Sequence, residues 1–256
     1  MSVSKAANEK MPVFCRKNRR DLTGRSGGTK MNFASAAELV GPYIIGMIFL
    51  EKPSFQPGKG EQIPNNSCGT GLLLGKSKYI LTAKHVIRPT NWHMFISSNP
   101  PRKVPTSQWL DFEICAEYDQ HDLAIIRVPE IDVSFLDQCR KLKFEYEIPG
   151  YGTPLGSFGC PLPKVTMNPR EQTFDMELQI RFKSYYVAMA HHEPSEYLIL
   201  DSFAYGGHSG GPVFDWQGRV IGIMVRSELK NKDMEVSFSH AAMVRNIRNE
   251  LPSFLK

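Results

Sequence analysis

Residues 206–212 read Gly-Gly-His-Ser-Gly-Gly-Pro, and the apolar pair Val213-Phe214 follows them. Glycine tolerates the positive φ angles of tight turns and lets another chain approach the backbone closely. Such a loop can aim several backbone N–H groups at one point. Ser209 is therefore a candidate nucleophile, and the amides of Gly207 and Ser209 are candidates for an oxyanion hole. Taken alone, the loop also fits a glycine-rich turn around an ordinary serine.

Two upstream stretches carry the partners that a nucleophilic serine requires. Residues 79–87 (YILTAKHVI) predict a strand that runs into a small-residue turn at His85. Residues 121–128 (HDLAIIRV) place Asp122 at the start of a strongly apolar strand. A carboxylate there is partly desolvated and needs a hydrogen-bond partner such as an imidazole N–H. Each residue alone has a simpler explanation, a histidine at a strand end and an aspartate in a turn.

Together, these stretches resemble the trypsin/chymotrypsin superfamily of serine peptidases. Residues 82–85 (TAKH) match the family's T-A-x-H, residues 122–124 (DLA) its D-[IL]-A, and residues 207–212 (GHSGGP) its G-x-S-G-G-P. The resemblance spans roughly residues 36–250 and is closest to HtrA/Deg-like and other intracellular trypsin-like peptidases. It implies an all-β fold of two six-stranded antiparallel barrels with a short C-terminal helix.

The resemblance also implies a division of labour. Ser209 would be the nucleophile of a serine endopeptidase, His85 its general base, and Asp122 the residue that orients the histidine. A catalytically silent relative that serves as a protein- or nucleic-acid-binding module is the alternative. The family implies a protein or peptide substrate and no metal or organic cofactor.

The substrate pocket is also taken from the resemblance. It would involve residues 203–206, the strand 224–227 and the segment near residues 238–240. We expect an apolar or small side chain before the cleaved bond, because no acidic residue stands at Phe203. An acidic side chain is the alternative if His240 lines the pocket, since an imidazolium would pair with it. The predicted pocket residues are Phe203, Ala204, Tyr205, Gly206, Val225, Ser227 and His240.

Two positions depart from the secreted members of the family. Val86 stands where those enzymes commonly carry a cysteine, which favours a disulfide-free chain. His208 stands where they carry an aspartate that captures a new N-terminus during zymogen activation. We therefore expect activity to be controlled by a loop rearrangement, a regulatory partner or a homo-oligomer.

Short apolar runs separated by Gly, Pro, Asn and Asp predict many short strands from about residue 35 onward. Residues 1–34 predict a flexible basic tail, and residues 35–256 the peptidase domain. Within it we place the first barrel at 35–145 and the second at 146–256. Helices are predicted at 35–40 and around 240–250. The predicted strands are 43–50, 70–74, 79–83, 94–97, 112–116, 123–128, 176–182, 197–201 and 219–225.

The charge, the cysteines and the hydropathy of the chain narrow the remaining classes of protein. The net charge of +5 comes from residues 1–30, which carry +6, while the rest of the chain carries −1. The basic run in this tail indicates nucleic-acid contact only weakly. Five scattered cysteines and no visible signal peptide predict free thiols and an intracellular, cytoplasmic location. No apolar run predicts a membrane span. His191-His192 lacks a third metal ligand, so an exposed loop is the simpler explanation.

Overall fold

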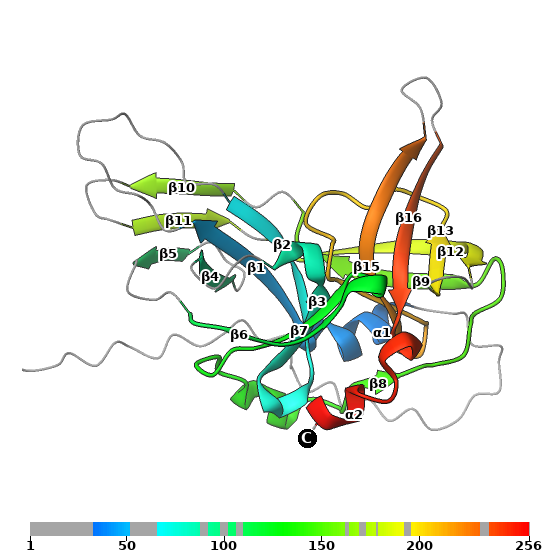
Figure 1. Cartoon of the computed structure of the whole chain (residues 1–256), viewed down its shortest axis with the longest axis horizontal. Helices are drawn as coiled ribbons and strands as arrows, with labels where there is room; N and C mark the ends of the chain where they lie inside the picture. Colours follow the sequence, from blue (N-terminus) through cyan, green and yellow to red (C-terminus); the bar gives the residue numbers. More distant parts are fainter. Residues whose placement is uncertain are drawn as a thin grey trace, which may run out of the picture.

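A computed structural model describes residues 33–51, 66–87, 92–97, 102–105, 110–161, 164–168, 173–177, 179–191, 196–230 and 236–255. Most of the predicted basic tail, residues 1–32, lies outside these ranges. In Figure 1 the described elements form two groups of strands, with α1 (Phe33–Val40) close to both and α2 (Leu251–Phe254) near the C-terminus.

The first barrel is a six-stranded sheet in the order β4-β1-β2-β3-β7-β6. A bridge between Met94 in β4 and Leu110, just before β6, closes it, with the Leu110 N–H donating to the Met94 carbonyl at 3.0 Å. Its strands are β1 (Ile44–Glu51), β2 (Asn66–Leu73), β3 (Tyr79–Ala83), β4 (Trp92–Ser97), β6 (Glu113–Tyr118) and β7 (Leu123–Arg127).

The second barrel closes through β14, which pairs with both β9 and β15. The resulting ring of six antiparallel strands runs β14-β9-β12-β13-β16-β15, and β8 is added in parallel outside β15. Its strands are β8 (Lys143–Phe144), β9 (Pro154–Gly159), β12 (Arg181–His191), β13 (Tyr197–Leu200), β14 (Pro212–Phe214), β15 (Arg219–Lys230) and β16 (Val236–Met243). The predicted double six-stranded barrel with a short C-terminal helix is confirmed.

A third sheet was not anticipated from the sequence. It contains three antiparallel strands in the order β10-β11-β5. Their bounds are β5 (Arg102–Pro105), β10 (Lys164–Asn168) and β11 (Thr173–Glu177). β5 follows the first-barrel strand β4 in the chain, whereas β10 and β11 lie between second-barrel strands, so this sheet adds a backbone link between the two halves.

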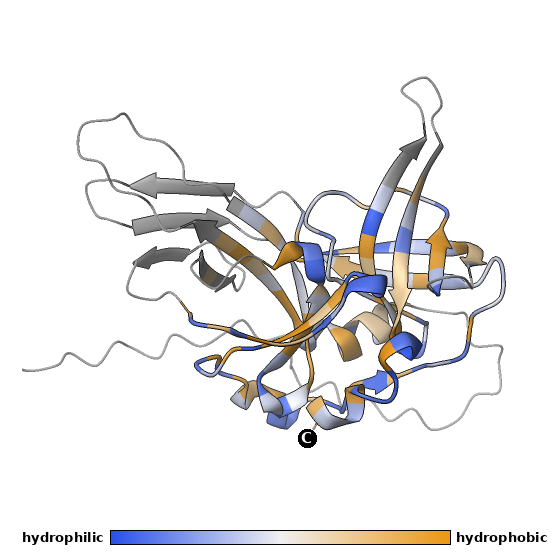
Figure 2. Ribbon diagram, viewed as in Figure 1, coloured by the Kyte–Doolittle hydropathy of each residue, from blue (hydrophilic) through white to orange (hydrophobic). Residues whose placement is uncertain are grey.

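The two barrels share one hydrophobic core. Buried residues of β1, β2, β3 and β7 cluster with Phe158, Phe214 and Val225 from the second barrel. Figure 2 shows hydrophobic segments running through β1, β3 and β7, and most of the apolar residues described in these strands are buried. A second, smaller cluster fills the interior of the second barrel. The shared core fixes how the ends of the two sets of strands meet.

The structure differs from three of the predicted boundaries, those of a helix, a strand and the first barrel. The helix predicted around 240–250 is wrong in position, because residues through Met243 belong to β16 and pair with β13 and β15, and α2 starts at Leu251. The strand predicted at 176–182 is two strands, the end of β11 and the start of β12, whose alternation continues across the break. β8 lies before the predicted barrel boundary at 145 and 146 but pairs with β15.

Candidate active site

His85 leaves the first barrel in a short 3-10 helix, η3 (Lys84–Val86), directly after β3. The preceding residues Thr82 and Ala83 are fully buried, and Val86 on the other side is 1% exposed. The Ile87 N–H closes the turn on the Lys84 carbonyl at 3.0 Å. His85 therefore projects from a rigid strand end, and its side chain is 47% exposed.

Asp122 has the left-handed backbone conformation, with φ = 52°, after the 3-10 helix η5 (Asp119–His121). This conformation is uncommon outside glycine, although Asp adopts it more readily than most residues. The Asp122 carbonyl accepts the Lys84 N–H at 2.8 Å, so the turn is tied to the start of η3. The strained residue is thus held against the segment that carries His85.

The Asp122 carboxylate contacts His85 through both of its oxygens. Oδ1 accepts the backbone N–H of His85 at 3.0 Å, and Oδ2 lies 2.6 Å from the ring Nδ1. A carboxylate is only an acceptor when ionised, so this pairing favours the ring form that carries its proton on Nδ1. In that form Nε2 keeps its lone pair and can accept a proton.

The loop around Ser209 has positive φ at two glycines, 92° at Gly207 and 85° at Gly210. The Gly210 N–H donates to the Met224 carbonyl at 2.7 Å, and the Gly211 N–H to the His208 carbonyl at 2.9 Å. A side chain at Gly207 would place its Cβ 2.1 Å from the Cys160 carbonyl oxygen. The conformation therefore needs glycine at these positions, as the sequence pattern suggested.

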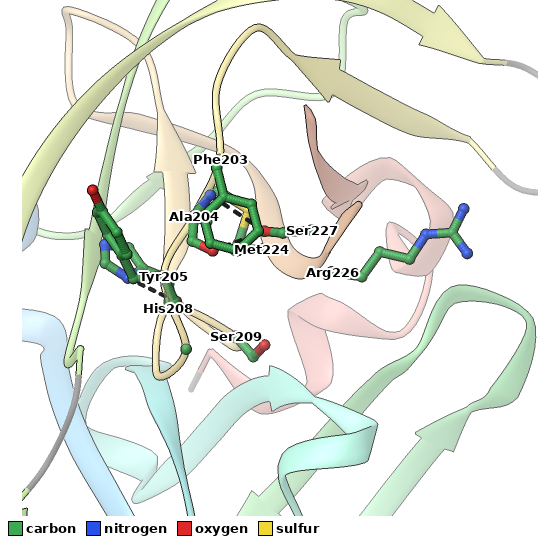
Figure 3. A pocket seen from close by; sticks show the side chains of 9 residues that line it. Phe203, Ala204, Tyr205, His208, Ser209, Met224, Arg226 and Ser227 are labelled. Carbon is green, nitrogen blue, oxygen red and sulfur yellow. Dashed lines mark hydrogen bonds between the residues drawn. The ribbon is translucent and has the colours of Figure 1, made fainter. Parts of the chain in front are cut away.

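Ser209 lies against the first-barrel strands that lead to His85. Its carbonyl accepts the Thr70 N–H at 2.8 Å. A Cβ on Gly69 would lie 2.4 Å from a methyl of Val86 and 3.0 Å from the Ser209 carbonyl oxygen. Only the backbone of Gly69 therefore lies between the Ser209 carbonyl and the side chain of Val86, the residue after His85. In Figure 3 the partly buried Ser209 side chain lies at the end of the pocket nearest the cyan ribbon of the first barrel.

The predicted oxyanion-hole amides lie on either side of His208. Among the hydrogen bonds of the described residues, none has the N–H of Gly207 or Ser209 as its donor. The Gly207 carbonyl, by contrast, accepts both the Thr70 hydroxyl at 2.7 Å and the Cys160 N–H at 3.2 Å. Other backbone groups of the loop therefore anchor it, and the N–H groups of Gly207 and Ser209 are not used for this purpose.

A pocket of about 180 Å³ opens beside Ser209. Five of the seven predicted pocket residues line it, namely Phe203, Ala204, Tyr205, Gly206 and Ser227. The remaining lining residues are His208, Ser209, Met224 and Arg226. Figure 3 shows these side chains grouped around the opening, with the guanidinium of Arg226 directed away from the others.

The other two predicted pocket residues do not line this pocket. Val225 is 1% exposed and packs in the core shared by the barrels, because side chains alternate along β15 and a register shift sits between Met224 and Arg226. His240 is 7% exposed and lies near the Tyr197 ring, at 6.4 Å between centroids. Their places on the pocket wall are taken by Met224 and Arg226.

The comparison with protein families matches this architecture. The model of the trypsin-like peptidase domain matches residues 69–223, more than half of the chain and a range that includes His85, Asp122 and Ser209. The chain belongs to the trypsin-like peptidase family. A comparison with curated proteins finds no match.

Within this trypsin-like peptidase domain, the floor of the pocket is held by neutral hydrogen bonds. The Ala204 N–H donates to Ser239 Oγ at 2.7 Å and to Ser227 Oγ at 3.3 Å. Ser239 in turn donates to the Ser202 carbonyl at 2.7 Å. No acidic residue is among the residues that line the pocket.

A cation lies behind this floor. Lys183 Nζ donates to the Phe203 carbonyl and lies 5.0 Å from the ring centroid of Tyr185 and 5.4 Å from that of Tyr205. Burial lowers the pKa of Lys183, and the nearby Asp201 partly opposes the shift. Lys183 is therefore a cation bonded to the backbone of Phe203, one of the residues that line the pocket.

Sequence reasoning missed the residues that join the two barrels at the site. Thr70 is fully buried, donates to the Gly207 carbonyl and accepts the Cys160 N–H at 3.0 Å. Lys183 was not recognised either, because it belongs to none of the motifs that mark His85, Asp122 and Ser209. Thr70 directly follows the Gly69 of a family-like G-T-G stretch, which was the only available signal.

The other candidate features are a metal site, the cysteines and a membrane span. Among the described residues, no group of three or more His, Cys, Asp or Glu could hold a metal ion. His192 lies outside these residues, as does the side chain of His191. Four cysteines are described, and none of these four forms a disulfide bond. In the same part of the chain, no helix is long and apolar enough to cross a membrane.

Proposed function

We propose that this protein is a serine endopeptidase in which Ser209 is the nucleophile, His85 the general base and Asp122 the orienting carboxylate. The observation that carries the proposal is the two-point contact of Asp122 with His85, on a segment packed next to the Ser209 loop. A carboxylate on Nδ1 favours the tautomer whose Nε2 can accept a proton, which supports the proposal.

In the proposed reaction, Ser209 Oγ attacks the carbonyl carbon of the scissile peptide while its proton passes to His85 Nε2. The carbonyl oxygen becomes an alkoxide, which the Gly207 and Ser209 amides stabilise. The imidazolium then gives that proton to the leaving amine, the C–N bond breaks, and an acyl-enzyme remains. Water then attacks the acyl carbon while His85 takes one of its protons. The ester bond to Ser209 Oγ breaks, the acid leaves, and His85 returns the proton to Ser209.

The pocket supports a refinement of the substrate class. It has an apolar wall at Phe203 and Met224, no carboxylate in its lining, and Lys183 behind its floor. A lysine or arginine side chain would therefore enter without an ion-pair partner and near a like charge. We infer that the residue before the cleaved bond is uncharged and small or apolar.

The decisive experiment compares the wild-type protein with Ser209→Ala. Wild type should react irreversibly with a fluorophosphonate and hydrolyse peptides, and S209A should do neither. Ser253→Ala is the matched control, because Ser253 is exposed and bonds only to the Glu250 carbonyl among the described residues. A wild-type protein that never labels, alone or with candidate partners, would overturn the proposal in favour of a binding module.

A further inference from the structure

The residue before the nucleophile is a buried histidine. His208 is 2% exposed, and its ring lies against the backbone of β9, where a Cβ on Gly159 would be 2.5 Å from two ring carbons. Its Nε2 is buried and has no hydrogen-bond partner among the described residues. A buried polar atom without a hydrogen-bond partner needs an explanation. The hydrogen bond made by the other ring nitrogen, Nδ1, provides it.

His208 makes two hydrogen bonds to one carbonyl. Its backbone N–H donates to the Tyr205 oxygen at 3.1 Å, and its ring Nδ1 lies at 3.1 Å from the same oxygen. A carbonyl only accepts hydrogen bonds, so Nδ1 carries the proton in this contact. Figure 3 shows the two residues on the same side of the pocket, joined by a dashed line.

The segment closed by these bonds is a four-residue turn from Tyr205 to His208. Its third residue, Gly207, has φ = 92°, which identifies a type II turn rather than type I. The two types differ by a flip of the central peptide, here the bond between Gly206 and Gly207. The turn type therefore decides which way the Gly207 N–H points.

Two consecutive glycines offer little resistance to such a flip, because neither has a side chain that restricts its backbone. An external restraint is needed to keep one orientation. The Gly207 carbonyl is held by Thr70 and Cys160, but that carbonyl belongs to the next peptide. The backbone bond from His208 to the Tyr205 carbonyl occurs in both turn types. The additional restraint on this turn is the second bond to the same carbonyl, which comes from the ring Nδ1.

We propose that His208 is a positioning residue whose ring N–H, with its own backbone N–H, clamps the Tyr205 carbonyl and keeps the Gly207 amide facing the oxyanion site. This inference rests on the proposed peptidase function. His208 acts through Gly207 and touches neither the scissile bond nor the proton that His85 moves.

The surroundings of His208 favour a neutral ring. Arg181 and Lys183 on β12 face His208, and the Tyr205 ring centroid is 6.3 Å away. Burial lowers the pKa of His208 and the two cations lower it further, while the bond to the Tyr205 carbonyl opposes the shift. A second proton on the buried Nε2 would find no acceptor among the described residues.

Two substitutions separate the clamp from simple packing. His208→Asn keeps an N–H donor near the position of Nδ1, whereas His208→Leu fills similar space without one. We expect H208L to lower kcat and the rate of fluorophosphonate labelling by about 10²–10³-fold, the usual effect of losing an oxyanion donor, with KM nearly unchanged. H208N should stay within about tenfold of wild type. Equal losses in folded H208N and H208L, or a normal rate in H208L, would overturn the proposal.

A spectroscopic measurement tests the clamp without relying on activity or on variants. The ¹⁵N shifts of the His208 ring in the full-length wild-type protein should show a neutral ring protonated on Nδ1 near neutral pH. A ring protonated on Nε2 alone would overturn the clamp even in an active enzyme. If the protein proves inactive but the Nδ1 form is present, the peptidase proposal fails while the clamp stands.

Discussion

The carboxylate of Asp122 holds His85 at two points, with Oδ2 2.6 Å from the ring Nδ1 and Oδ1 3.0 Å from the backbone nitrogen. Asp122 reaches this position from a left-handed turn whose carbonyl also accepts the Lys84 N–H. One side chain, that of Asp122, therefore holds both the ring of His85 and the backbone that carries it.

Replacing Asp122 with Asn should preserve the fold and lower kcat by roughly 10⁴, the effect known for chymotrypsin-type triads, because the amide favours the wrong histidine tautomer. Steady-state hydrolysis of an ester or peptide measures the loss. Asp119→Asn is the control, since Asp119 is exposed and pairs with Lys84. Turnover of D122N close to that of D119N would remove Asp122 from the mechanism.

The hydrolysis rate should depend on the protonation of the proposed base. Only a neutral His85 can accept the Ser209 proton, so kcat/KM should rise from acidic to neutral pH. Measuring kcat/KM across this range with a substrate that has no titrating group tests the expectation. A flat profile would count against His85 as the base.

The unfolding free energy should fall as the solution is acidified below about pH 6.5, the ordinary pKa of histidine. Burial lowers the pKa of both His208 and His121 in the folded protein. As the pH falls, the unfolded chain therefore binds protons before the folded protein does. The stability that the two neutral histidines contribute is present above about pH 6.5 and is lost as the pH falls toward their pKa values in the folded protein. The loss of Tm from pH 7 to 5 should be smaller in H208N than in wild type, and identical losses would contradict the prediction.

Side-chain charge before the cleaved bond should matter because of Lys183. A substrate with lysine there should have a kcat/KM at least about tenfold below that of one with norleucine, since a like charge is met at a partly desolvated site. Lys183→Met should bring the kcat/KM values of the lysine and norleucine substrates closer together. Lys76→Met, at an exposed pair with Asp137, should leave the ratio of these two values unchanged. A preference for lysine in wild type would refute the inferred pocket chemistry.

Thr70 should matter to both stability and rate. Thr70→Val removes a buried hydroxyl that bonds the Gly207 carbonyl and the Cys160 N–H, so we expect a loss of about 1–3 kcal/mol in unfolding free energy. A lower kcat should accompany it, because the nucleophile loop loses an anchor. Thr82→Val, which removes a single bond to the Thr70 carbonyl, is the comparison. Denaturant unfolding that leaves T70V as stable as wild type would contradict this role.

Much of the fold could be predicted because strand formation is largely local in its signals. The runs at 79–83 and 123–128 became β3 and β7 almost residue for residue, since each is a short apolar run that is buried along most of its length. The segment 240–250 failed because its alanines and charges satisfy a helical pattern, while pairing with β13 and β15 offered the backbone a partner that the pattern does not reveal.

The sequence by itself determined the family, the double-barrel class and the glycines that the loop around Ser209 requires, because these follow from short patterns read along the chain. Only the tertiary structure decided that Asp122 meets His85, that Thr70 joins the barrels beneath Gly207, that Lys183 lies behind the pocket and that His208 bonds to Tyr205 rather than to solvent. Those relationships depend on the packing of strands far apart in sequence around a shared core, and side-chain distances of a few ångströms across such a core leave no periodic trace in the chain.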